Sequence, residues 1–419
     1  MMTKTAAKIS SANDLHILRA NPYWAKLPLF DHKGWKRLSF SAFAESVNER
    51  VDPSAAGDEI YVGLEHLDPQ DLHIRRWGKG SDVIGTKLRF QKGDVIFGRR
   101  RAYQRKLAVA EFDGICSAHA MVVRAKPEMV LPEFLPFLMM SDRFMKRAIE
   151  ISVGSLSPTI NWKTLKLEEF ALPPLAQQRR IAEILVAANV VENQYHGLHQ
   201  SLVELFQAVS VDQFPNPTQS KSRFVPFNEI CLRQPQSGLY KGPEFVGTGV
   251  KTVNMGELFG NELIDQNVPM HRMELSPKEV ENYSLTLNDL LFGRRSIVLA
   301  GAGKCVMVGH LTEPTIFESS ILRVTIDPNK ALSGFVFDWF NSPAGEKEIK
   351  RIRSFTTIAG ITGSALKKVL VPLLSIKEQR SIFDRLTKYR ERIKQVKDAQ
   401  QMMARTRAAL LEELVRELP

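Results

Sequence analysis

Two long stretches of the chain repeat apolar residues at alternating spacings of three and four, the pattern of a helix that packs along its length against a second helix. We place these helices at 177–210 and 377–419. At 1.5 Å per residue, each would extend roughly 50 Å or more, which is longer than one small domain needs. Pairing of the two helices as a spacer is therefore favoured over two helices that each lie on their own domain. The predicted seams consist of Ile181, Ile184, Val191, Leu198, Leu202 and Leu205 in the first helix, and of Ile382, Leu386, Ile393, Val396 and Leu410 in the second.

The segment before each long helix has a mixed pattern. In the first copy, short apolar runs at Asp94–Phe97, Leu107–Ala110 and Ala120–Val123 are bounded by glycine, proline or charged residues, which is typical of strands in a small sheet. A helix-like stretch follows at Glu133–Ile149, and its counterpart in the second copy is Gly334–Ile352. The pattern predicts an α+β fold with two globular domains of mixed sheet and helix.

The chain also carries an internal repeat of long period. Gly93–Arg100 matches Asn288–Arg295 at an offset of 195 residues, and both blocks end in Phe-Gly-Arg-Arg. Gln178-Arg179 matches Gln379-Arg380 at an offset of 201, so the second copy has a net insertion of six residues between the two blocks. These ordered matches predict an internal pseudo-two-fold repeat. The expected segments are a first domain at 1–176 with an N-terminal arm at 1–35, a central helix at 177–210, a polar, proline-marked linker at 211–222, a second domain at 223–376 and a distal helix at 377–419.

Composition and charge narrow the class of protein. Of 419 residues, 44% are hydrophobic and 25% are charged, which is ordinary globular composition and excludes wholesale disorder. Three widely separated cysteines without a Cys-x-x-Cys motif favour reduced thiols in a cytoplasmic protein, and we expect neither a secretory signal nor a membrane span. An excess of 57 basic over 46 acidic residues gives a net charge of +11. This charge favours a polyanionic partner such as nucleic acid, with solubility alone as the alternative explanation.

No catalytic constellation stands out in the sequence. Gly301–Lys304 resembles the end of a phosphate-binding loop, but Val298 occupies a position that requires glycine, and Cys305 replaces the Ser or Thr that binds magnesium. His196 and His199 lie one helical turn apart, yet no carboxylate or thiol completes a metal set nearby, so a solvated helix face explains them better. We therefore expect a binding protein with no catalytic residue, no metal and no cofactor of its own.

A basic stretch follows the repeated block in the first copy. Arg99–Lys106 holds five basic residues in eight and no acid, in what we expect to be an exposed loop after a strand. Arginine binds phosphates or forks onto guanine, and tyrosine and glutamine add contacts and hydrogen bonds. A single arginine is as easily a solvated surface charge, but the basic block recurs in both copies while the residues after it diverge. The expected DNA-binding residues are Arg99, Arg100, Arg101, Tyr103, Gln104, Arg105, Lys106, Ser155, Ser157 and Thr159 in the first copy, and Arg294, Arg295, Lys304, Thr356 and Thr357 in the second.

Four segments together resemble the specificity (S) subunit of Type I restriction-modification systems. They are Gly93–Arg100, Asn288–Arg295 and the two turns that open the long helices, Leu172–Ile181 and Leu374–Ile382. The usual turn of the family is Pro-Pro-Leu-x-Glu-Gln-x-x-Ile; here Gln177 replaces the glutamate, and the second turn lacks the paired prolines. The resemblance covers residues 36–416.

The resemblance implies two target recognition domains, each reading one half of a bipartite, asymmetric site in double-stranded DNA. It also implies that the two long helices separate these domains and pack as an antiparallel coiled coil that fixes the gap between the half-sites. Such a subunit has no activity of its own. It recruits two methyltransferase (M) subunits to its long helices and their turns. These subunits bind S-adenosylmethionine and methylate an adenine flipped out of the duplex, and restriction or motor (R) subunits can then join.

Two interpretations from other classes of protein stay open. A degenerate DNA methyltransferase or nuclease would bind S-adenosylmethionine or a divalent metal by itself. A coiled-coil scaffold whose basic charge is incidental would show no strong fall of DNA affinity with salt, whereas phosphate contacts require one.

Overall fold

The computed structural model describes residues 32–214, 223–355 and 358–415. Contacts divide the chain into two compact units: Met1–His196 with Asp398–Pro419, and Gly197–Lys397. The first unit is therefore built from both ends of the chain and the second from its middle. The division runs through both long helices, whereas the sequence prediction treats each helix as a segment of its own. The expected N-terminal arm as far as residue 31, and the linker from residue 215, lie outside the described ranges.

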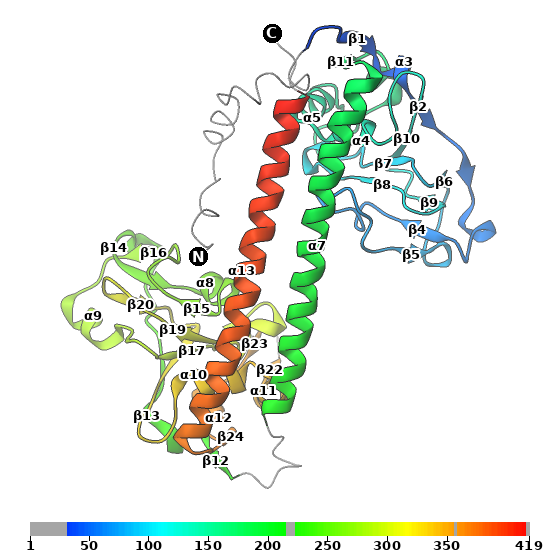
Figure 1. Ribbon diagram of the computed structural model, residues 1–419. Coiled ribbons are helices and arrows are strands. Elements are labelled where there is room, and N and C mark those ends of the chain that lie inside the picture. The colour runs from blue at the N-terminus through cyan, green and yellow to red at the C-terminus, as the bar shows by residue number, and fades with distance from the viewer. Residues whose placement is uncertain (1–31, 215–222, 356–357, 416–419) are drawn as a thin grey trace, which may run out of the picture. The chain divides into compact units, whose positions relative to one another are not determined.

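The first unit contains two small sheets and the strand pair β1–β11 (Figure 1). The four-stranded sheet has the order β2–β10–β7–β8 with antiparallel neighbours, and the short apolar runs predicted as strands form its β7, β8 and β10. The five-stranded sheet has the order β3–β6–β9–β4–β5, and β1 pairs with β11. The elements are β1 (Lys36–Ser39), α3 (Phe40–Phe43), β2 (Ala44–Val47), β3 (Arg50–Val51), η2 (Pro53–Ala55), β4 (Ile60–Val62), β5 (Gly78–Lys79), η3 (Gly80–Asp82), β6 (Lys87–Phe90), β7 (Val95–Phe97), η4 (Ala102–Gln104), β8 (Leu107–Val109), β9 (Gly114–Cys116), β10 (Met121–Ala125), α4 (Leu135–Met140), α5 (Asp142–Glu150), α6 (Trp162–Leu165) and β11 (Glu169–Leu172).

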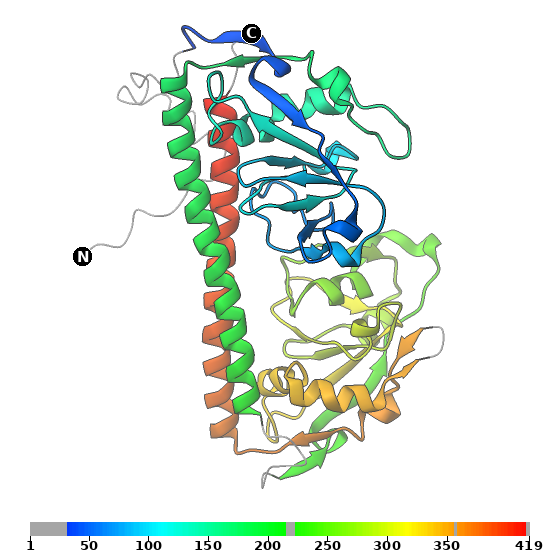
Figure 2. The same cartoon turned by 90° about the vertical axis from the view of Figure 1, so that its right-hand side faces the viewer.

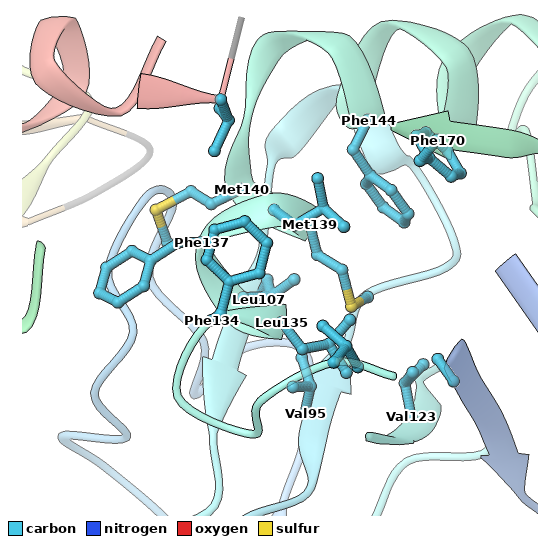
Figure 3. Close-up of a cluster of buried hydrophobic side chains, with 14 of the residues drawn as sticks. Val95, Leu107, Val123, Phe134, Leu135, Phe137, Met139, Met140, Phe144 and Phe170 are labelled. Atoms are coloured by element: carbon cyan, nitrogen blue, oxygen red, sulfur yellow. The ribbon is translucent and has the colours of Figure 1, made fainter. Parts of the chain in front are cut away.

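Aromatic side chains from several elements fill the core of the first unit (Figure 3). Phe134 beside α4, Phe144 from α5 and Phe170 from β11 are at most 1% exposed, and the rings of Phe144 and Phe170 lie 5.3 Å apart. Leu411 and Leu414, near the end of the chain, belong to the same cluster. The core of this unit therefore requires residues from both of its segments.

The second unit also combines a five-stranded sheet with smaller sheets. Its five-stranded sheet has the order β13–β21–β17–β19–β15, two three-stranded sheets have the orders β16–β14–β20 and β18–β23–β22, and β12 pairs with β24. The elements are β12 (Phe224–Pro226), η5 (Phe227–Ile230), β13 (Cys231–Ser237), η6 (Pro243–Phe245), β14 (Val246–Val253), α8 (Met255–Gly260), β15 (Leu263–Ile264), β16 (His271–Met273), α9 (Pro277–Tyr283), β17 (Leu290–Gly293), β18 (Arg295–Ser296), η7 (Leu299–Gly301), β19 (Cys305–Val308), β20 (Thr315–Phe317), β21 (Ile321–Ile326), α10 (Ser333–Phe340), α11 (Pro343–Ile352), β22 (Ser354–Phe355), β23 (Ala359–Gly360), α12 (Gly363–Leu366) and β24 (Leu370–Pro372).

The internal repeat is confirmed by hydrogen bonds made at equivalent positions. The side-chain amide of Gln178 accepts a bond from the Leu131 backbone N–H at 2.9 Å and donates to the Met129 and Pro173 carbonyls. Gln379, 201 residues later, accepts from the Leu332 N–H at 2.8 Å and donates likewise to two carbonyls. Both glutamines are at most 1% exposed, so each anchors a long helix to its own unit through a fully paired buried amide.

The strand turn that opens the first matching block is also the same in both units. Gly93 and Asn288 occupy it with left-handed φ angles of 93° and 68°, which glycine and asparagine tolerate best. The next residue, Asp94 or Asp289, is buried, and its carboxylate accepts a 2.8 Å bond from the backbone three residues before it. The residues that match between the two copies at this point therefore form the same turn in both units.

Each helix-like stretch predicted before the Ser/Thr loop is two helices rather than one. Ser141 begins α5 and accepts a 3.3 Å bond from the Phe144 N–H, while Ser342 begins α11 and accepts a 3.2 Å bond from the Gly345 N–H. A serine in this position satisfies a backbone donor at a helix start and therefore favours a new helix. The spacing of apolar residues continues from the first helix into the second, so the sequence pattern did not indicate that one helix ends and another begins.

The two long helices are α7 (Leu175–Gln213) and α13 (Ile376–Leu414), each of 39 residues. In the first unit, the N-terminal half of α7 lies beside the C-terminal half of α13, as Figure 2 shows, and Gln400 contacts His196. In the second unit, the C-terminal half of α7 lies beside the N-terminal half of α13, and Arg385 donates to Gln213 at 3.2 Å. The helices therefore run antiparallel. None of the helices in the described ranges is long and apolar enough to cross a membrane.

The residues at the seam differ from the prediction on one helix. On α7, Val191, Leu198 and Leu205 are 39%, 48% and 47% exposed, and the inward positions belong to residues such as Leu185 and Glu192. The prediction for these three residues is corrected, because polar side chains occupy part of the true seam and apolar spacing alone marked a stripe beside it. The remaining predicted positions are buried or partly buried: Ile181, Ile184, Leu202, Ile382, Leu386, Ile393, Val396 and Leu410.

Candidate nucleic-acid interface

The basic block of the first unit forms the tight connection between β7 and β8. After Gly98 the chain passes Arg99 and Arg100 and turns through η4, which is flanked by Arg101 and Arg105. Both flanking arginines have left-handed backbones, with φ angles of 57° and 52°. Such a conformation is uncommon outside glycine, so surrounding contacts must hold this turn.

The Ser/Thr loop of the first unit pairs with this basic connection. The Ile160 N–H donates to the Arg99 carbonyl at 2.9 Å, and the Arg101 N–H donates to the Pro158 carbonyl at 2.8 Å. Thr159 forms a bridge with Arg100. Two segments that lie about sixty residues apart in sequence are therefore brought together. The predicted Ser155, Ser157 and Thr159 lie on the partner loop of the predicted arginines.

The second unit contains the same pairing of loops. Arg295 pairs with Gly360, and the Ile361 N–H donates to the Arg294 carbonyl at 3.0 Å. Ser354 also pairs with Gly360, so the loop folds back on itself as its counterpart does in the first unit. The predicted Thr356 and Thr357 lie outside the described residues. We call this surface, formed in each unit by the basic connection and the Ser/Thr loop, the two-loop surface.

Several predicted residues are open to a ligand on the two-loop surface. Arg101 and Arg295 are exposed, and the Tyr103 side chain is 54% exposed. Two aliphatic side chains that the prediction did not include, Leu156 in the first unit and Ile297 in the second, are each 90% exposed. Gln104, Arg100, Arg294 and Ser157 are partly buried.

Three other residues predicted to bind DNA have cationic groups that hydrogen-bond within the protein. Arg105 donates to the Asp142 carboxylate at 2.5 Å and to the Met140 carbonyl at 3.0 Å. Lys106 donates to the Leu64 carbonyl at 2.6 Å. Lys304 donates to the Phe259 carbonyl and lies over the Phe259 ring, and burial lowers its pKa. These hydrogen bonds fix the basic connection of each unit to neighbouring elements.

Sequence reasoning missed two cations that lie near Arg99 in the fold. Arg50 on β3 and Lys87 on β6 come from separate strands, and neither stands in a basic run. The effect of Lys87 is visible at His119, whose ring lies 3.4 Å from the Arg100 guanidinium. Burial, Arg100, Arg99 and Lys87 together lower the pKa of His119. The side chains around the two-loop surface of the first unit therefore create a positive potential that favours an anion.

Cys116, Cys231 and Cys305 are buried free thiols, and burial raises the pKa of Cys116 and Cys231 to about 12, so these two are protonated at neutral pH and poor nucleophiles. Within residues 32–214, 223–355 and 358–415, no group of three or more His, Cys, Asp or Glu side chains is arranged to hold a metal ion.

The sequence and the fold of this chain were compared with those of known proteins. Residues 80–189, which contain the two-loop surface of the first unit, match the family described as Type I restriction modification DNA specificity domain. The chain is 27% identical over 193 residues to the Type I restriction enzyme EcoDI specificity subunit of Escherichia coli, a match that covers 43% of this chain and 41% of that one. It is 24% identical over 338 residues to the EcoKI specificity subunit of Escherichia coli strain K12, covering 77% of this chain and 68% of that one. The crystal structure of the Type I restriction-modification system S subunit from M. genitalium shares the fold, with a TM-score of 0.56 and 12% identity over 92% of this chain and 97% of that one.

The chain is therefore a protein with two repeated units and two paired long helices, and its first unit contains a match to a DNA specificity domain. Residues 80–189 match the Type I DNA specificity domain, and the chain is similar to Type I restriction enzyme specificity subunits over up to 77% of its length in the EcoKI match. Its match spans less than half of the EcoDI subunit and about two thirds of the EcoKI subunit.

Proposed function

We propose that this chain is the non-catalytic sequence reader of a Type I restriction-modification complex in the cytoplasm, and that each unit reads one half of a bipartite site in double-stranded DNA. The observation that carries the proposal is the two-loop surface, which has the same backbone pairing in both units. Its exposed side chains differ, with Arg101 and Tyr103 in the first unit and Arg295 and Ile297 in the second. The same backbone pairing with different exposed side chains would let the two units read two different half-sites, as an asymmetric DNA target requires.

The experiment that tests this proposal is methylation mapping. DNA from a host that carries the chain with a candidate M subunit is compared with DNA from a host that lacks only this chain. We expect a split, adenine-methylated motif that disappears with the deletion. Unchanged methylation, with assembly of the complex demonstrated, would refute the proposal.

A division of labour between subunits follows from the same proposal. Two M subunits would dock on the long helices, where the apolar side chains of Val191, Leu198 and Leu205 are exposed on α7, and would supply the S-adenosylmethionine site. R subunits would join this complex. The helix pair would also set the gap between the half-sites. Calorimetry with S-adenosylmethionine should give no heat of binding for the chain alone and saturable binding for its complex with M subunits. Binding by the chain alone would favour a degenerate methyltransferase instead.

A further inference from the structure

A cavity of about 560 Å³ lies in the first unit next to the two-loop surface. Its walls come from β2, β6 and β10 and from the segment that follows β2. Arg99, at the start of the basic connection, forms part of the wall, and so does Trp162 just after the Ser/Thr loop. The cavity therefore adjoins the surface to which we assign DNA, yet it contains residues that the proposed function does not use.

The charge in this cavity is unbalanced. Arg50, Lys87 and Arg99 line it, and all twelve lining residues are described and none of them is acidic. Lys87 is only 8% exposed, and its ammonium donates to the Ile84 and Gly85 carbonyls rather than to a carboxylate. An ammonium has three donors, so one remains for another acceptor. Buried charge without a counter-ion is costly, which favours an anion in this place.

The guanidinium of Arg99 is also incompletely satisfied. Its Nη2 donates to the Ala118 carbonyl at 2.9 Å, but its Nε is buried and makes no hydrogen bond in the structure. A buried donor left without an acceptor destabilises the folded protein, and an anion in the cavity would supply that acceptor. The lowered pKa of His119, caused by burial and then by Arg100, Arg99 and Lys87, reports the same positive potential. Asp52 offsets it only weakly, because this exposed carboxylate does not line the cavity and its pKa is lowered mainly by hydrogen bonds from Ser54 and least by Lys87.

We propose that this cavity is a phosphate-binding site, in which Arg50, Lys87 and Arg99 donate to the phosphate oxygens. Two sources have this chemistry: a backbone phosphate of the duplex on the two-loop surface, and a free phosphate or nucleotide. The first source rests on the proposed function, and the second does not. A guanidinium fork and an ammonium point charge together are a common means of holding a phosphate.

The test measures binding of inorganic phosphate to the full chain by calorimetry, for the wild type and for Arg99→Gln. The matched control is Arg37→Gln, an exposed arginine on β1 in the same unit that does not line the cavity. We expect Arg99→Gln to weaken phosphate binding at least tenfold, on the order of one charge-assisted hydrogen bond, and Arg37→Gln to leave it within about twofold. Arg50→Gln, an exposed position whose variant should fold, is expected to weaken binding in the same direction.

A second arm separates the two sources. The affinity of the same variants for a 30-base-pair duplex is measured by fluorescence anisotropy at several salt concentrations, with phosphate as competitor. If Arg99→Gln lowers the salt dependence by about one phosphate contact and phosphate competes, the source is the DNA backbone. If phosphate binding is lost but duplex binding is unchanged, the source is a free phosphate, and the site stands even without the proposed function. If Arg99→Gln and Arg37→Gln behave alike toward both ligands, the proposal is overturned.

Discussion

The buried arginine of α13 provides a quantitative prediction for the first unit. Arg407 is 4% exposed, and its Nε donates to the Glu192 carboxylate on α7 at 2.6 Å. Its other nitrogens reach the Gln70 carbonyl at 2.8 Å and the Met140 sulfur at 3.2 Å. The substitution Glu192→Ala leaves this guanidinium in place but removes its only anionic partner among these three contacts.

The magnitude follows from burial. Removing one partner of a buried ion pair costs about 3–5 kcal/mol, because the other charge stays buried and uncompensated. The Glu192 side chain is 21% exposed, so water can replace part of the lost interaction, and we expect the lower end of that range. Replacing both residues with apolar ones, as in Glu192→Leu with Arg407→Met, removes the charge as well as its partner. This double variant should be within about 1 kcal/mol of the wild type.

The assay is urea-induced unfolding, with hydrogen exchange on peptides from α4 and α13 to assign the effect to the first unit. The control is Glu150→Ala, which breaks an exposed pair with Arg147 at 3.0 Å in the same unit and should cost less than about 1 kcal/mol. The reasoning fails if Glu192→Ala costs no more than Glu150→Ala. It also fails if the double variant is as unstable as the single one.

Three further predictions concern other parts of the molecule. Arg105→Ala should leave the salt dependence of duplex binding unchanged, whereas Arg101→Ala should lower its slope by about 0.9, and anisotropy titrations at several salt concentrations would expose the opposite result. Gln379→Leu should cost about 1–3 kcal/mol in urea unfolding because the Leu332 N–H loses its buried acceptor, and a loss below about 0.5 kcal/mol would contradict the anchoring role. Burial raises the pKa of Asp338 from 3.8 to about 6, so the folded state holds this proton more tightly than the unfolded state does; the stability of the wild type relative to Asp338→Asn should fall as pH rises through this interval, and a flat difference would argue against it.

The repeat and the long helices could be predicted because their signals are local or directly repeated. Gln178 and Gln379 matched in sequence, and in the structure they make the same bonds. The two-loop surface could be predicted only in part. Two basic blocks and two hydroxyl-rich loops were visible as separate segments, but nothing in the sequence stated that Thr159 lies beside Arg100.

The individual side chains were harder to predict, since their partners come from distant positions. Whether Arg105 faces DNA depends on Asp142, 37 residues away, and the Arg50 and Lys87 cavity is assembled from strands without any shared motif. Val191, near the middle of the α7 seam, was misplaced because its neighbour Glu192, a charged residue, occupies the inward position opposite Arg407. Apolar periodicity cannot register a seam position that is filled by a salt bridge.

Because the first unit contains residues from both ends of the chain, its two segments are synthesised at different times. Domains generally fold as units while the chain emerges from the ribosome, the N-terminal one first. Here Leu411, Leu414 and Val415 belong to the core of the first unit, and they are made only after all of Gly197–Lys397. The second unit can therefore fold first. The N-terminal segment of the first unit completes its core only after the C-terminal end of α13 has been synthesised.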